Sequence, residues 1–82
     1  MDYEKWLENL YIETFEATIR AIEYRRESDP KYTLNELLSQ LEAMYVIDGN
    51  NYGGRSIAAQ TDLEASIAAM QFMVNQWRKE AK

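Results

Sequence analysis

The stretch Thr61–Ala81 constrains the fold most strongly, because its apolar residues follow the period of an α-helix. Alternating spacings of four and three separate Leu63, Ile67, Met70, Val74, Trp77 and Ala81. Such a stripe is the buried face of a helix that packs along its length against other helices. Acidic residues in its first turn, Asp62 and Glu64, and basic residues near its end, such as Arg78, both favour the helix dipole. We therefore expect this segment to be the main helix of a small bundle.

Residues 2–27 are predicted to form another long helix, which carries two neighbouring apolar seams. The first seam consists of Tyr3, Leu7, Leu10, Thr14, Ala17, Ala21 and Tyr24. The second seam consists of Trp6, Tyr11, Phe15, Thr18 and Ile22. Together they form a face wider than a two-stranded coiled coil requires, which is typical of a helix in a globular bundle.

The start of the next helix is open to two interpretations. In the first, Asp29–Pro30 begins it, with the aspartate as cap and the proline at the first helical position. In the second, Thr33 is the cap, and Glu36, three residues later, completes a capping box. We favour the second, because Tyr32 and Leu37 are also spaced to pack together as a hydrophobic staple.

The predicted second helix covers residues 34–47 and is shorter than its two neighbours. Its expected buried face consists of Leu34, Leu37, Leu38, Leu41, Met44 and Tyr45. Val46 and Ile47 follow, and we expect them to turn back under the next loop. That loop, residues 48–55, contains all three glycines of the chain, which indicates a connection rich in turns.

The third helix has two possible starts. Ser56 can cap an early start, whereas Thr61 can cap a later one, with Glu64 completing a capping box. In either case the short connections place the helices up, down and up. We expect a single domain over residues 1–82. Its fold class is all-α, an antiparallel three-helix bundle, with helices at about residues 2–27, 34–47 and 56 or 61 to 80.

Composition argues against several classes of function. The chain has neither cysteine nor histidine, so it lacks thiolate ligands, the usual general base and the commonest transition-metal ligand. We therefore expect no enzyme, no catalytic residue, no metal and no cofactor. A net charge of −5 argues against nucleic acid as a partner. No apolar run approaches the roughly 20 residues of a membrane span. The lack of cysteine fits a reducing compartment, and we expect a cytoplasmic protein.

The first helix contains two pairs of glutamates whose spacing is compatible with a metal site. Glu13 and Glu16, and likewise Glu23 and Glu27, have spacings that place two carboxylates on one helix face. Mg²⁺ accepts such ligands. The second helix offers no acidic pair at a matching spacing, however, so we interpret these glutamates as a solvated acidic face.

The end of the glycine-rich loop suggests an anion site. Gly53, Gly54, Arg55 and Ser56 lead into the start of the third helix. Free amides and the helix dipole attract anions at such a position, and Arg55 can clamp a phosphate or carboxylate. The alternative function is therefore a regulatory accessory protein that binds a small anion or nucleotide at Gly53–Ser56.

The leading functional prediction comes from a mismatch in helix length. At 1.5 Å per residue the second helix is about 21 Å long, against about 30–37 Å for the other two. It cannot cover both apolar faces, so either the 48–55 loop, with Tyr52 as a lid, or another chain must do so. A contiguous apolar patch is rarely left bare on a monomer, so we predict a homodimer or another protein partner. The chain is then a small, non-enzymatic, self-associating interaction module. The predicted interface comprises Tyr3, Trp6, Leu7, Leu10, Tyr11, Tyr52 and Ile57.

Overall fold

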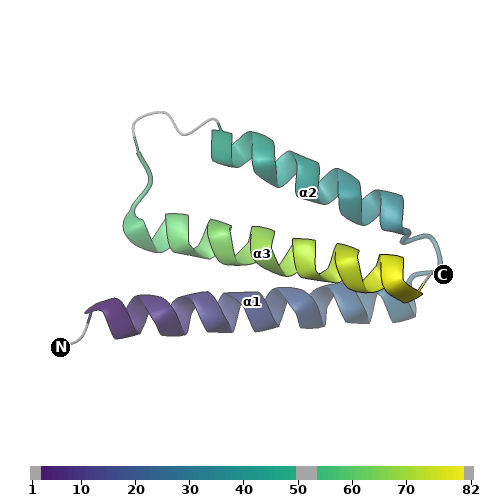
Figure 1. Ribbon diagram of the computed structural model, residues 1–82, viewed down its shortest axis with the longest axis horizontal. Coiled ribbons are helices and arrows are strands. Elements are labelled where there is room, and N and C mark those ends of the chain that lie inside the picture. The colour runs from purple at the N-terminus through teal and green to yellow at the C-terminus, as the bar shows by residue number, and fades with distance from the viewer. Residues whose placement is uncertain (1–2, 50–53, 81–82) are drawn as a thin grey trace.

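A computed structural model describes residues 3–49 and 54–80 of the chain. Within those ranges it contains three helices and no strand, and it confirms the predicted all-α three-helix bundle (Figure 1). The helices are α1 (Tyr3–Ser28), α2 (Leu34–Gly49) and α3 (Ile57–Glu80). Tyr52, Gly53 and Ala81, which were given roles on sequence grounds, lie outside the described residues.

The helix directions alternate along the chain, so α1 and α3 run the same way and α2 runs opposite to both (Figure 1). Helix α3 packs against α1 on one side and against α2 on another. Among the described residues, no Cα atom of α1 comes within 8 Å of a Cα atom of α2. The first two helices are therefore consecutive in sequence, but their backbones do not pack closely against each other. Helix α3 contacts both other helices, and small residues such as Ala65 and Ala69 are fully buried on it.

The core lies near the end of the molecule where α1 ends, α2 begins and α3 ends. Its buried side chains are Ile22, Tyr32, Leu37, Leu41, Met73 and Val74. Leu37 has no exposed surface, and the ring of Tyr32 lies 5.9 Å from that of Trp77. The connection between α1 and α2 thus contributes its own aromatic residue to the core.

The start of α2 confirms Thr33 as the cap, because the backbone N–H of Glu36 donates to Thr33 Oγ1 at 3.3 Å. Asp29 has a different role from the one that the competing interpretation gave it. The backbone N–H of Lys31 donates to Asp29 Oδ1 (3.0 Å), and that of Tyr32 donates to the Asp29 carbonyl (3.0 Å). Asp29 therefore closes a tight turn before the helix begins.

The start of α3 follows the early alternative. Ser56 caps the helix, because its Oγ accepts the backbone N–H of Ala59 at 3.1 Å and its carbonyl accepts that of Gln60 at 3.0 Å. The later start at Thr61 is wrong, since Thr61 lies inside α3.

The end of α2 corrects a further expectation. The helix continues to Gly49, so Val46 and Ile47 remain helical and do not turn back under the loop. Their side chains are 57% and 50% exposed. Because α2 ends two residues later than predicted, Val46 and Ile47 keep helical geometry, and their side chains point away from the core.

Candidate functional site

The two apolar seams of α1 have different environments. Apart from Trp6, which is exposed, the second seam packs toward α3: Ile22 is buried, and Phe15 meets Phe72 edge-on at 6.1 Å between ring centroids. The first seam is called here the α1 seam and comprises Tyr3, Leu7, Leu10, Thr14, Ala17, Ala21 and Tyr24. None of its residues is buried, and Tyr24 is 73% exposed. The α1 seam stays open because the backbone of α2 comes close to that of α3 and not to that of α1.

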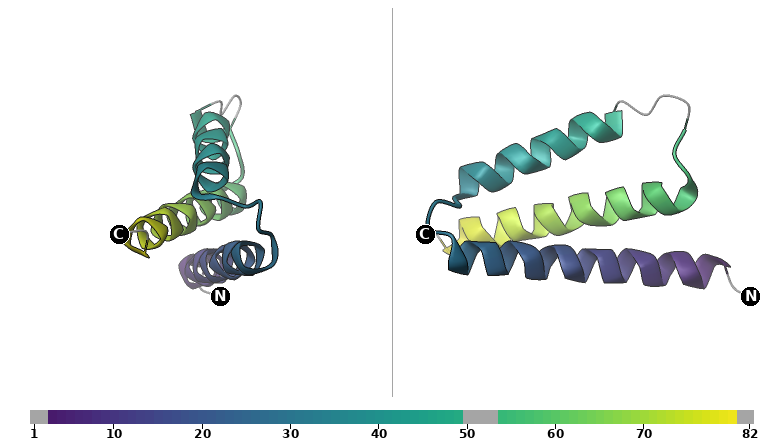
Figure 2. Two further views of the ribbon diagram at one scale, coloured as in Figure 1. Left: turned by 90° about the vertical axis from the view of Figure 1, so that its right-hand side faces the viewer. Right: turned by 180° about the vertical axis from the view of Figure 1, so that it is seen from behind.

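A groove of about 500 Å³ lies beside the middle of this seam, between α1 and α3, with Tyr32 and Gln40 lining it on the α2 side. Thr14, Ala17 and Ala21 line it on the α1 side, while Ser66 and Met70 of α3 contribute to its lining as well. Because the α1 side chains that line the groove are small, they leave it unfilled. Figure 2 shows α1 and α2 standing apart, joined at one end by their connection. The groove therefore gives access to the α1 seam from solvent.

The N-terminal end of α1 carries an exposed aromatic pair. The rings of Tyr3 and Trp6 are stacked at 5.8 Å between centroids, with 23° between their planes. They are 51% and 47% exposed. Ile57, which is 58% exposed, begins α3 at the same end of the molecule, where α2 does not reach (Figure 1). The α1 seam and this pair form one apolar strip along the helix.

The structure places the predicted interface residues in different surroundings. Tyr3, Trp6, Leu7 and Leu10 lie on or beside the α1 seam. Tyr11 does not belong with them, since its ring stacks on Phe15 at 6.4 Å, on the side of α1 that faces α3.

Sequence reasoning missed the C-terminal half of the open seam as a surface. The signal that could have found it is the pair of alanines, Ala17 and Ala21, spaced by four and followed by Tyr24. Among the described residues outside the α1 seam, five large apolar ones are also exposed where the sequence does not predict it. They are Ile12, Tyr45, Val46, Ile47 and Phe72.

Arg55, the predicted anion clamp, contacts protein groups in the structure. Its guanidinium donates to Gln60 Oε1 at 2.9 Å and to the carbonyl of Ile47, and it lies 3.9 Å from Asp48 Oδ1. It thereby braces the end of α2 against the start of α3. The hydroxyl of Ser56 likewise serves its own helix. These contacts favour a structural role, and anion binding at Gly53–Ser56 stays a prediction.

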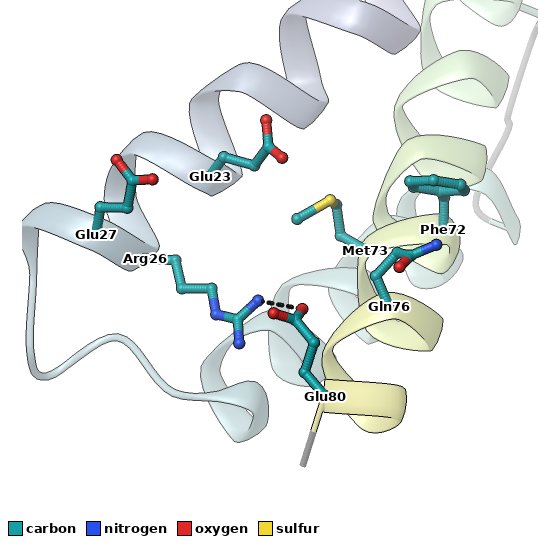
Figure 3. A pocket seen from close by; sticks show the side chains of 7 residues that line it. All are labelled: Glu23, Arg26, Glu27, Phe72, Met73, Gln76 and Glu80. Carbon is teal, nitrogen blue, oxygen red and sulfur yellow. Dashed lines mark hydrogen bonds and ion pairs between the residues drawn. The ribbon is translucent and has the colours of Figure 1, made fainter. Parts of the chain in front are cut away.

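A second hollow, of about 660 Å³, lies on the other side of α1, between α1 and α3 (Figure 3). At its edge Arg26 Nη1 donates to Glu80 Oε2 at 2.8 Å, and the guanidinium lies 4.1 Å from the centre of the Trp77 ring. Glu23 and Glu27 also line this hollow. Within the described ranges, no three acidic, histidine or cysteine side chains gather as a metal site would require.

Tyr32 is the described residue whose ionisation the fold changes clearly. Burial raises the pKa of its phenol above the ordinary value of 10.0, the charge of Arg25 lowers it, and that of Glu36 raises it. The Tyr32 hydroxyl donates to Gln40 Oε1 at 2.7 Å. The phenol is thus held in its neutral form inside the core.

Comparisons with protein families, with curated proteins and with solved structures find no match for this chain. None of the helices, over the residues described, is long and apolar enough to cross a membrane.

Proposed function

We propose that this chain is a small helical protein–protein interaction module that acts without catalysis by associating with a second copy of itself. The docking surface is the strip formed by the α1 seam and the Tyr3–Trp6 pair. The supporting observation is that none of the strip's residues is buried, although they have the spacing of a packed face. Leu7, Leu10 and Thr14 are half-buried, and the Thr14 hydroxyl donates to Asp62 Oδ1 of α3 at 2.9 Å, while the other strip residues are exposed. Contiguous apolar patches of this kind mark interaction sites on soluble domains.

The kind of residue exposed also supports the proposal. Tyr and Trp are enriched at protein interfaces, and a few such side chains contribute most of the binding energy. Trp6 is therefore the expected anchor. A homodimer is the commonest assembly of soluble chains, and one helix surface meeting its own copy satisfies the required two-fold symmetry.

Sedimentation equilibrium over a range of concentrations tests the proposal. The wild-type chain is expected to shift from monomer to dimer, and Trp6→Ala should weaken the dimer about thirtyfold, the equivalent of losing one interface hot spot of about 2 kcal/mol. Ile12→Ala is the matched control: Ile12 is 53% exposed on the same helix but lies outside the strip. A chain that stays monomeric at every concentration contradicts the proposal, as does an equal loss in both variants.

A further inference from the structure

The charges beside the α1 seam show how the two copies would pair. This inference rests on the proposed self-association and specifies its geometry. We infer that α1 packs antiparallel against α1 of a second copy, seam against seam, with Glu13 of each chain facing Arg20 of the other.

The seam itself has the residue sizes that this pairing needs. Its spacing of four and three is that of the core positions of a coiled coil, in which residues of facing helices meet in layers. In the proposed register, Leu7 meets Tyr24 of the second copy, Leu10 meets its Ala21, and Thr14 meets its Ala17. Each layer joins a larger side chain to a smaller one, except at the two ends, where leucine and tyrosine meet. The small residues at the centre let the helices approach closely.

The flanking charges favour this register over its neighbours. Glu13 and Arg20 lie on the same flank of the seam, seven residues apart, and both are exposed. Within the described part of the chain neither has a hydrogen bond or an ion pair. In an antiparallel pair the same flanks of the two helices face each other, so each glutamate meets the arginine of the other copy.

Alternative arrangements place like charges together. Sliding one helix by a heptad in one direction brings Glu13 against Glu13 of the second copy, and sliding it the other way brings Arg20 against Arg20. A parallel pair would instead bring Arg20 close to Arg25 of the second copy. Like charges directly opposite each other disfavour these three alternatives, and opposite charges meet only in the proposed one.

The other flank adds a second pair of opposite charges. Glu4 lies there near the start of α1 and faces Arg25 of the second copy in the same register. Both side chains are exposed. Arg25 also lies 3.9 Å from Asp29 and 4.4 Å from the centre of the Tyr32 ring, which keep its guanidinium near this flank. The ion pairs therefore sit on both sides of the apolar strip, as at the rim of a protein interface.

Charge reversal tests the pairing directly. Glu13→Arg places two positive charges on the facing flanks, and Arg20→Glu places two negative ones. Each variant alone is expected to weaken self-association roughly ten- to thirtyfold, because attraction at two symmetric positions becomes repulsion. An equimolar mixture of the two should recover wild-type affinity as a heterodimer, which native mass spectrometry distinguishes by mass. Circular dichroism of each variant checks that the helices are retained.

Glu16→Arg is the control, since it makes the same charge change on the same helix but away from the seam; it should leave the affinity within about twofold of the wild type. A wild-type chain that never dimerises overturns both the pairing and the proposed function. A wild-type dimer that the two reversals do not weaken, or a mixture that does not recover, overturns the pairing alone and leaves self-association standing.

Discussion

The two ends of the bundle contain the same kinds of side chain in opposite environments. At the closed end, where α1 meets α2 through their connection, Leu37 is fully buried and Tyr32 is only 4% exposed. At the open end, Trp6 is 47% exposed and Ile57 is 58% exposed. Apolar character is thus abundant at both ends, and the difference lies in how many elements converge there. Three elements meet at the closed end, whereas α2 does not reach the far end of α1 (Figure 1).

Charged residues reinforce the contrast. At the closed end, Arg25 lies 4.4 Å from the ring centre of Tyr32, and Arg26 lies 4.1 Å from that of Trp77. A guanidinium over an aromatic face gains electrostatic energy and also shields the ring from water. The closed end is therefore sealed by its arginines as well as by its core.

The largest expected difference between the ends comes from matched leucine substitutions. Leu37→Ala empties a fully buried site and should lower the free energy of unfolding by about 2–5 kcal/mol. Leu10→Ala, at a half-buried site of the open seam, should cost about 1 kcal/mol in the monomer, because little apolar area returns to water. Chemical denaturation of dilute protein, followed by tryptophan fluorescence, measures both. Equal costs would show that the open end is as tightly packed as the core.

Helix caps give a smaller difference between the same two ends. Thr33→Ala removes the cap of α2 beside the buried core and should cost about 1 kcal/mol. Ser56→Ala removes the cap of α3 at the open end, where the first turn can fray without disturbing the core, so about 0.5 kcal/mol is expected. Thermal unfolding of the two variants compares them, and a larger loss at Ser56 would reverse the proposed order of the ends.

The smallest effect concerns pH and the closed end alone. Burial raises the pKa of Tyr32 in the folded state above its unfolded value of 10.0, so the folded state holds this proton more tightly. The resulting stabilisation is fully present below pH 10 and is lost as the pH rises through the folded pKa. Wild-type protein should therefore lose more stability than Tyr32→Phe between neutral and strongly alkaline pH. Denaturation midpoints across that range measure it, and identical pH profiles would contradict a buried neutral phenol.

Much of the fold could be predicted from the sequence, because helix periodicity and capping are local properties. Thr33 and Ser56 cap helices where their neighbours in sequence suggest that they should. The arrangement of the helices was harder to foresee. Both seams of α1 have helical spacing, and the choice of the one facing α3 depends on the contact between residues distant in sequence, such as Phe15 and Phe72.

The candidate site was predictable only in part. The length mismatch correctly pointed to exposed aromatic surface near Trp6, since length is readable from residue number. The sequence does not predict the groove beside Ala17 and Ala21, because the groove depends on α2 lying close to α3 and away from α1. The bracing role of Arg55 also depends on tertiary structure, since this arginine precedes α3 while its carbonyl partner, Ile47, belongs to α2. Local patterns therefore reveal the elements, and the gaps between elements appear only in three dimensions.

The position of α3 between the other two helices has a consequence for synthesis of the chain. Helix α1 leaves the ribosome first, yet the surface it packs against is the last to be made. While α2 is being translated, α3, the helix that α1 packs against, has not yet been made. The α2–α3 hairpin is local and forms across a short connection, whereas docking of α1 must close a loop that spans the whole of α2. Of these three helices, α1 is synthesised first and is the last to pack into the bundle.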